Sequence, residues 1–272
     1  MTLKQLLIGT AAGRFAMHAR ETPTLWRTIR TSPGFAATLL SEQCAMRLLT
    51  MLCKPGATFV DVGSHYGSVI AAVMDRNASI KVIAIEAIPA KVQNLRRKFP
   101  QVQIHACAAG ETDGEVEFFV DQQEPACSTL GKPTGEHESH VLSIKVPMRR
   151  LDGLIPAADV DVMKIDVIGA ELGVVRGASD LIARCRPLIV FESGPATNDG
   201  LGYTKQALWE WFTDHQYQIV VPNRVPHDAP PLTCDGFLES HFYPMRTINY
   251  CAIPSERRIE IRDRAREVVD TK

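Results

Sequence analysis

The chain has no excess of basic residues. Its 272 residues include 30 Lys and Arg against 31 Asp and Glu, for a formal net charge of −1 and a pI near 6.7. Proteins that bind nucleic acids or anionic membranes through their overall charge need a surplus of cations to neutralise phosphates. The composition therefore argues against a nucleic-acid partner, although it leaves room for a small local basic patch.

Paired cysteines and long apolar runs are also missing. The seven cysteines are scattered, with no C-x-x-C pair and no Cys/His spacing typical of a metal site. They predict reduced, mostly buried thiols in a cytoplasmic protein. No run approaches the ~20 apolar residues that span a bilayer. The opening residues 1–20 predict an amphipathic helix rather than a signal peptide, because Arg14, His18 and Arg20 interrupt their short apolar patch.

What the chain does have is a regular alternation of strand-like and helix-like segments. Short runs rich in Val and Ile, apolar on both faces, are separated by helical patterns. Such strands indicate a mostly parallel sheet with helices on both sides, and hence an α/β fold. The predicted strands are 58–63, 81–87, 102–108, 160–167, 187–193, 217–222 and 248–253.

The predicted domain organisation is one large domain with two appendages. Residues 1–50 are expected to form a helical extension, and 51–255 the main domain, with an insertion at about 111–148 that contains two further strands. Residues 256–272, with mixed charges, predict a solvated terminal helix. Within the extension, Ser41 is predicted to cap a helix whose apolar face carries Cys44, Leu48, Leu49 and Leu52.

The stretch "FVDVGSHYGSVI" follows the first predicted strand and has no G-x-G-x-x-G dinucleotide pattern. Gly63 and Gly67 lack a Cβ, so the chain can bend sharply and bring backbone N–H groups against a ligand. His65 and Tyr66 would crowd a pyrophosphate. The loop therefore favours a ligand with a smaller zwitterionic group at this point, although glycines are common at ordinary strand-to-helix junctions.

A second acidic residue supports a nucleoside ligand. Glu86 ends the next strand, about 25 residues after Asp61, where a carboxylate can accept hydrogen bonds from both ribose hydroxyls. Taken alone, Glu86 is more simply explained as a solvated carboxylate at the end of a strand. An adenosine ligand without pyrophosphate points to S-adenosylmethionine. The predicted cofactor-binding residues are Asp61, Gly63, Ser64, His65, Tyr66, Gly67, Glu86, Ala87, Ile88, Cys107, Ala108 and Asp166.

Five blocks of the sequence resemble FkbM-type methyltransferases. They are "KPGATFVDVGSHYG", "AIEAIPAKVQNLRRKF", "VPMRRLDGL", "VMKIDVIGAELGVVRGASDLI" and "RPLIVFES", over about residues 40–195. The resemblance implies a Rossmann-like class I methyltransferase fold, with seven strands of which the last is antiparallel. It also implies S-adenosylmethionine as donor and a hydroxyl of a sugar, glycolipid or natural product as acceptor.

One residue departs from the family pattern. Ile168 stands in "KIDVIGAE" where the family usually has a glutamate. If that glutamate assists proton removal or orders the acceptor, this chain has lost it or uses another group. If it only begins the helix, the exchange is nearly neutral, and the sequence leaves both readings open.

Methylation of a hydroxyl is helped by a nearby base, and four residues are candidates. Asp166 ends the fourth core strand and is the first choice, with a helix cap as its alternative role; Glu171 is equally well explained by the helix dipole. Glu192 is open to acceptor binding or pairing with Lys164, and His65 is the weakest candidate. Asp166, Glu171 and Glu192 are also an alternative set of ligands for a divalent cation, but no tight ligand spacing makes a metal the first prediction.

The leading hypothesis is an O-methyltransferase acting on a small hydroxylated molecule. A nicotinamide-dependent oxidoreductase is the first alternative, and the missing middle glycine argues against it. A cofactor-binding module with little turnover is the second, suggested by Ile168. The helical extension is a candidate surface for a homo-oligomer.

Overall fold

The computed structural model describes residues 7–121, 123, 128–131, 141–194 and 201–270. Its secondary structure follows the predicted α/β alternation closely. The elements are α2 (Ala11–Thr31), η1 (Pro33–Phe35), α3 (Ala36–Leu52), β1 (Thr58–Val62), α4 (Ser68–Arg76), β2 (Lys81–Glu86), α5 (Pro89–Lys98), β3 (Gln103–Ala106), β4 (Ala108–Ala109), β5 (Gly114–Asp121), β6 (Val141–Arg149), α6 (Leu151–Leu154), β7 (Val160–Ile165), α7 (Glu171–Arg176), α8 (Ser179–Cys185), β8 (Leu188–Glu192), α9 (Lys205–Asp214), β9 (Tyr217–Val220), η5 (Pro222–Arg224), α10 (Cys234–Glu239), β10 (Asn249–Pro254), η6 (Ser255–Arg257) and α11 (Arg258–Asp270).

The main sheet has seven strands in the order β3-β2-β1-β7-β8-β10-β9. The pairs from β3 to β8 are parallel, whereas β10 runs antiparallel to both β8 and β9. The mostly parallel seven-stranded sheet with an antiparallel last strand is therefore confirmed. Because the parallel strands end at one edge, β1, β2, β7 and β8 bring their carboxyl ends together there.

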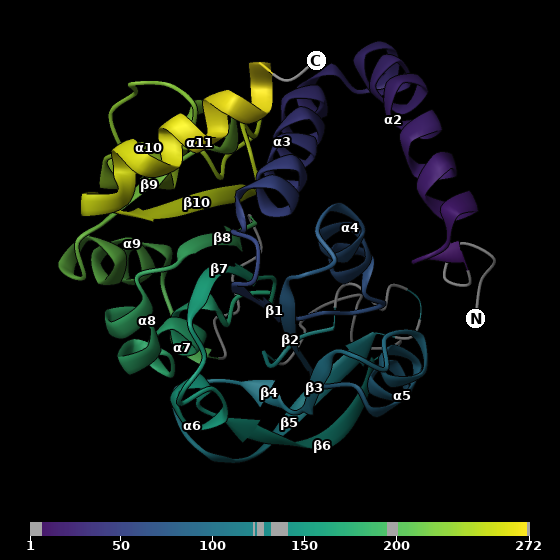
Figure 1. Ribbon diagram of the computed structural model, residues 1–272. Coiled ribbons are helices and arrows are strands. Elements are labelled where there is room, and N and C mark those ends of the chain that lie inside the picture. Colours follow the sequence, from purple (N-terminus) through teal and green to yellow (C-terminus); the bar gives the residue numbers. More distant parts are fainter. Residues whose placement is uncertain (1–6, 122, 124–127, 132–140, 195–200, 271–272) are drawn as a thin grey trace.

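Helices cover both faces of the sheet because its strands are apolar on both sides (Figure 1). Alternate residues of one strand enter different cores: Phe59 packs in the core formed with α3, α4, α5 and α11, and Val60 in the core formed with α6 to α10. Both side chains are fully buried. The period of two along each strand thus builds two hydrophobic cores from one sheet.

The insertion folds into a separate three-stranded sheet in the order β4-β6-β5. Strands β5 and β6 pair antiparallel from Gly114↔Met148 to Asp121↔Val141. The single strand predicted at 102–108 is confirmed as β3 over Gln103–Ala106 but is wrong for its last two residues. At Cys107 the chain leaves the main sheet, and Ala108 and Ala109 pair with β6 instead. The hairpin therefore starts directly beside the carboxyl edge of β2 and β3.

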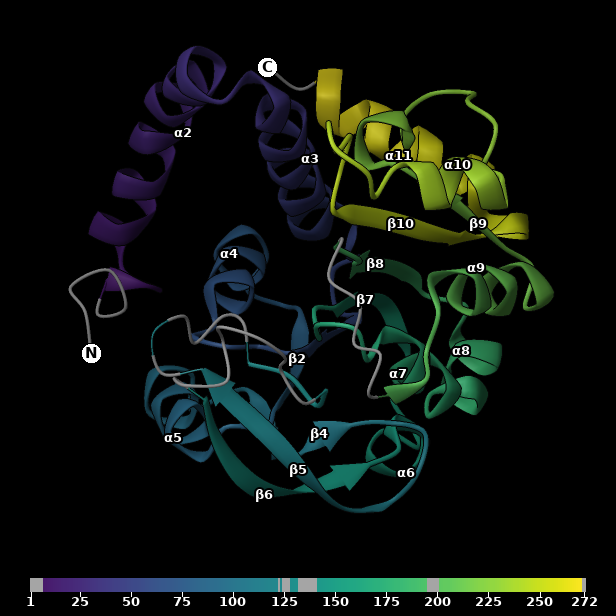
Figure 2. The same cartoon turned by 180° about the vertical axis from the view of Figure 1, so that it is seen from behind.

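The N-terminal extension consists of α2, η1 and α3, which meet at a corner on the outside of the molecule (Figures 1 and 2). The predicted cap at Ser41 is wrong, because α3 begins at Ala36 and Ser41 lies inside it. The buried Ser41 hydroxyl instead shares a 2.6 Å hydrogen bond with Thr247. Leu48, Leu49 and Leu52 are buried as predicted. Within the described residues, no helix is both long and apolar enough to cross a membrane.

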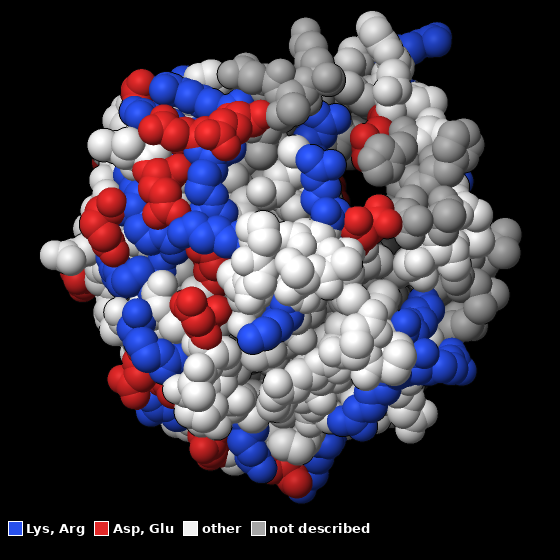
Figure 3. Space-filling model, viewed as in Figure 1, with Lys and Arg blue, Asp and Glu red and all other residues white. Residues whose placement is uncertain are grey.

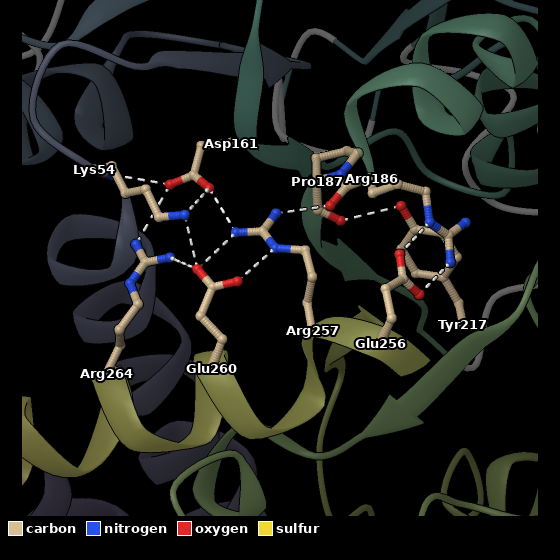
Figure 4. Close-up of polar contacts among 9 residues, drawn as sticks. All are labelled: Lys54, Asp161, Arg186, Pro187, Tyr217, Glu256, Arg257, Glu260 and Arg264. Carbon is tan, nitrogen blue, oxygen red and sulfur yellow. Dashed lines mark hydrogen bonds and ion pairs between the residues drawn. The ribbon is translucent and has the colours of Figure 1, made fainter.

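Ion pairs dock α11 onto the start of β7 (Figure 4). Buried Asp161 accepts hydrogen bonds from Arg257 (2.7 Å) and Arg264 (3.3 Å), and Glu260 pairs with Lys54 at 2.7 Å. Charges of both signs lie side by side over this face in Figure 3. The network joins the chain end to the amino edge of the sheet, opposite the carboxyl edge described above.

Candidate active site

A cavity of about 260 Å³ lies at the carboxyl edge of the main sheet. Eleven of the fourteen predicted site residues line it: Asp61, Gly63, Ser64, His65, Glu86, Ala87, Ile88, Cys107, Ala108, Asp166 and Glu192. Tyr66, Gly67 and Glu171 are not among its described lining residues. The parallel strands explain this convergence, because residues far apart in sequence share one sheet edge.

A second, more open hollow of about 460 Å³ lies beside the edge strand β9. Of its described lining residues, the one carboxylate, Glu256, is ion-paired with Arg186 at 2.6 Å. It contains none of the predicted site residues. We therefore place the chemistry in the cavity at the carboxyl edge.

Packing within the protein explains why positions 63 and 67, in the loop between β1 and α4, are glycines. A Cβ on Gly63, whose φ is +84°, would lie 2.0 Å from the Asp166 carbonyl oxygen. A Cβ on Gly67 would lie 2.5 Å from the Phe99 ring. The N–H groups of Gly63 and Gly67 donate to the carbonyls of Ile85 and Ser64. The expectation that backbone N–H groups of this loop face a ligand therefore does not hold for Gly63 and Gly67, whose N–H groups have partners in the chain.

Asp61 is the most unusual residue of the site. It is 1% exposed, and neither of its carboxylate oxygens has a hydrogen-bond partner among the described residues. Burial raises its pKa to about 6, whereas the Lys164 ammonium and the nearby Ser64 hydroxyl lower it. The Ser64 hydroxyl donates its hydrogen to the Asp61 backbone carbonyl, at 2.8 Å, rather than to the carboxylate. A buried carboxylate without a donor is costly. It is well suited to a cationic ligand group.

Glu86 joins the first two strand ends through backbone hydrogen bonds. Its Oε2 accepts from the His65 N–H and its Oε1 from the Ile88 N–H, both at 2.8 Å. Burial raises its pKa and the nearby Lys91 ammonium lowers it. Lys91 also lines the cavity, and its Nζ lies 5.6 Å from the centroid of the Tyr66 ring. Each carboxylate oxygen of Glu86 keeps a further lone pair and can accept another hydrogen bond. The contact with ribose hydroxyls is therefore still possible and stays a prediction.

Asp166 and Glu192 also line the cavity, together with Lys164. The Lys164 ammonium is ion-paired with Asp166. Asp166 does not cap the following helix, because the N-cap residue of α7 is Ala170. Burial lowers the pKa of Lys164, but Asp166, Asp61 and Glu192 together raise it.

The pKa of Glu192 is raised to about 7, chiefly by burial and then by the Asp166 charge. Lys164 opposes this rise and Glu42, from α3, adds to it. Three carboxylates, those of Asp61, Asp166 and Glu192, thus surround one ammonium. The site has an excess of negative charge and favours a positively charged ligand.

Glu171 has a structural position instead. Its Oε1 accepts from the Gly169 N–H at 2.9 Å in the turn that starts α7, and burial raises its pKa to about 8. Because it does not line the cavity, the proposed ligand set of Asp166, Glu171 and Glu192 is not assembled there. Within the described ranges no three His, Cys, Asp or Glu side chains are grouped as a metal ion would require.

The insertion contributes lining residues beyond the fourteen predicted site residues. Three of them belong to "PACSTL" (125–130), which resembles a Ser-containing family segment that was expected either to cover the cofactor or to be an ordinary loop. Phe118 of β5 and Ser128, Thr129 and Leu130 line the cavity. The Thr129 hydroxyl donates to the Ile168 carbonyl at 3.0 Å, which ties the insertion to the turn after β7. Residues 125–127 of that segment lie outside the described part. The two strands predicted in the insertion are present as β5 and β6, but no spacing in the sequence fixes where the segment between them crosses the sheet.

The strand order and a carboxylate-rich cavity at the parallel strand ends define a class I S-adenosylmethionine-dependent methyltransferase fold. The methyltransferase FkbM domain matches residues 61–219, more than half of the chain, and the chain belongs to this family. The match continues beyond the blocks quoted above, which end near residue 195.

Solved structures resemble the chain at low identity. Methyltransferase FkbM from Methylobacillus flagellatus is 16% identical, with a TM-score of 0.46 over 88% of this chain and 60% of that one. The chain thus spans 60% of that relative. A geranyl diphosphate methyltransferase in complex with SAM is 14% identical, with a TM-score of 0.42 over 79% of this chain and 86% of that one. A TehB-like SAM-dependent methyltransferase from Corynebacterium glutamicum is 11% identical, with a TM-score of 0.39 over 88% and 97%. No curated protein matches.

Proposed function

We propose that the protein is an S-adenosylmethionine-dependent O-methyltransferase that acts on a hydroxyl of a small molecule, such as a sugar, a glycolipid or a natural product. The observation that carries the proposal is the buried, unpartnered Asp61 carboxylate in a cavity with excess negative charge. When bound, S-adenosylmethionine supplies an electrophilic methyl group on a positively charged sulfonium.

The residues present fit that cofactor. Asp61 would hold the ammonium group, Glu86 the ribose hydroxyls, and Cys107 and Ala108 the adenine side of the cavity. The ammonium would satisfy both Asp61 oxygens and remove the cost of burying them. The free, buried thiols of Cys53, Cys107 and Cys251 agree with the reducing, cytoplasmic setting proposed for the protein.

Asp166 and Glu192 are the proposed acceptor-binding carboxylates. Glu192 is our choice for the base, because a pKa of about 7 lets it take a proton at neutral pH. Asp166, held by Lys164, would orient the hydroxyl. His65 lines the same cavity and stays an alternative base.

The charge of the cavity argues against a nicotinamide cofactor. NAD and NADP carry a pyrophosphate, which is stabilised by helix N-termini and basic groups. Here the strand ends present Asp61, Asp166 and Glu192, and no arginine is among the described lining residues. A cofactor-binding module with little turnover would bind S-adenosylmethionine in the same cavity but, with Ile168 in place of the usual glutamate, would not transfer the methyl group efficiently.

The decisive test is titration calorimetry with S-adenosylhomocysteine, followed by mass spectrometry of a panel of hydroxylated acceptors incubated with S-adenosylmethionine. We expect binding with one ligand per chain and a product heavier by one methylene. Binding of NADH but not of S-adenosylhomocysteine would contradict the proposal. Binding without any methylated product would favour the module.

A further inference from the structure

Exposed apolar side chains are concentrated on one part of the molecule. Of the eight exposed large hydrophobic residues among the described ones, only Leu142 and Ile259 lie elsewhere. The remaining six lie on α2, η1, α3 and the segment 242–243, and we call them the corner surface: Trp26, Ile29, Phe35, Leu40, Phe242 and Tyr243. Phe242 and Tyr243 are 72% and 69% exposed, and Trp26 is 62% exposed. Large apolar groups gathered in this way mark an interaction site more often than single exposed residues do.

The corner surface is held together across distant parts of the chain. The rings of Phe35 and Tyr243 lie 5.8 Å apart between centroids. The Thr38 hydroxyl donates to the Met245 carbonyl at 3.1 Å. The segment 242–245 is thereby fixed against the corner where α2, η1 and α3 meet (Figure 2).

The corner surface also has a local excess of positive charge. Residues 19–40 contain three arginines, Arg20, Arg27 and Arg30, and one acid, Glu21. All three arginines are exposed, and none is in an ion pair within the described part of the chain. Arg246 beside them is paired with Glu239. A chain whose net charge is −1 therefore presents a basic, aromatic surface here, which the overall composition conceals.

This surface is connected through the chain to the strand pair that contains Glu192. Segment 242–245 continues to Thr247, which is hydrogen-bonded to Ser41, and then into β10. The first residue of β10, Asn249, is paired with Glu192. The corner surface and the proposed base are thus joined by a few residues of ordered chain.

We propose that the corner surface docks on the surface of an anionic lipid bilayer. Arginines beside Trp, Tyr and Phe on an amphipathic helix suit the bilayer interface, where aromatic rings insert and guanidinium groups meet phosphates. A second copy of the chain fits less well. Residues 19–40 contain three arginines and one acid, so the same surface of a second copy offers few carboxylates to pair with those arginines.

Docking in this way would hold the segment that leads through Asn249 to Glu192 near the membrane surface. A membrane-anchored acceptor would then present its hydroxyl there, and this last step rests on the proposed function. Lipid binding itself does not require methyl transfer.

The test is co-flotation of the full chain with vesicles of phosphatidylcholine, with and without phosphatidylglycerol. We expect binding to the anionic vesicles only, weakening as salt is added. Arg27→Ala should lower partitioning about fivefold, and the Arg27→Ala/Arg30→Ala double variant about thirtyfold, since each basic residue near an anionic surface contributes a factor of about five. Lys81→Ala is the matched control, because exposed Lys81 begins β2 at the opposite edge of the sheet.

A second pair of variants tests the apolar contribution. Trp26→Ala/Phe242→Ala should abolish vesicle binding, while Ile259→Ala, which removes an equally exposed side chain from α11, should leave it unchanged. Thermal unfolding and S-adenosylhomocysteine affinity should be unaltered in all these variants, which separates lipid docking from the proposed function. Absence of anionic vesicle binding would overturn the proposal. So would a dimer, detected by light scattering of the protein alone, that the Trp26→Ala/Phe242→Ala variant abolishes.

Discussion

Replacing Asp61 with asparagine should stabilise the protein without ligand and weaken its cofactor binding. The carboxylate is 1% exposed and has no hydrogen-bond donor among the described residues, and burial raises its pKa from 3.8 to about 6. That difference corresponds to about 3 kcal/mol. Asparagine keeps the shape of the side chain but removes the buried charge.

The sign of this effect sets its pH dependence. Because the pKa of Asp61 is higher in the folded than in the unfolded state, its cost is absent below pH 3.8. It grows as the pH rises to about 6 and is complete above that value. Lys164 loses one attractive partner in the variant but keeps Asp166. We therefore expect Asp61→Asn to be more stable than the wild type by about 1–3 kcal/mol at pH 7, and by little at pH 4.

Urea denaturation at the two pH values measures the stability term. Titration calorimetry with S-adenosylhomocysteine measures the binding term. We expect a roughly 10- to 100-fold weaker affinity, because a hydrogen bond to a charged group contributes about 1.5–3 kcal/mol.

Asp161→Asn is the matched control. Asp161 is also a buried aspartate, but it is paired with Arg257 and Arg264 (Figure 4). Its loss should destabilise the protein by about 3–5 kcal/mol and leave cofactor affinity unchanged. If Asp61→Asn destabilises the protein in the same way, Asp61 has an internal structural partner, and the argument for a cationic ligand fails.

Three further predictions concern the same edge of the sheet. Glu192→Gln should lower the methyl-transfer rate by about 10²–10⁴-fold with unchanged S-adenosylhomocysteine affinity, and the wild-type rate should rise with pH through about 7. If Glu192→Gln leaves the rate unchanged, another residue is the base. Ile168→Glu adds a carboxylate to an acidic cavity, so the rising limb of the pH–rate profile should move to higher pH, and an unmoved limb would show that residue 168 is electrostatically remote from the base. Gly63→Ala should lower the free energy of unfolding, measured by urea denaturation, by about 3–5 kcal/mol, because the added Cβ clashes with Asp166 and residue 63 has a left-handed φ. Gly56→Ala, at a φ of +76° with nothing within 4 Å of the added Cβ, should lower it by only about 1–2 kcal/mol. Equal losses in the two variants would contradict the close approach of Gly63 to Asp166.

The sequence alone determined the strands and the edge at which the site forms. Runs such as 160–167 are apolar on both faces, and that pattern is local, so it is readable without the fold. Asp61, Glu86, Asp166 and Glu192 could be assigned to one cavity because each lies at, or within one residue of, the carboxyl end of a parallel strand. Parallel strands share a carboxyl edge whatever their order in the sheet.

Only the tertiary structure decided what each residue contacts. Residue 63 must be glycine because the backbone of Asp166, about a hundred residues later in the chain, lies against it. Ser41 lies inside α3 and is hydrogen-bonded to Thr247. Glu171 accepts from a turn rather than facing the cavity, while Phe118 and Thr129 reach it from the insertion. These outcomes depend on the register between strands and on where a hairpin crosses the sheet, both of which are set by the balance of packing over the whole molecule. The unpartnered state of Asp61, on which the proposed function depends, is likewise a property of its surroundings in the fold and of no local pattern.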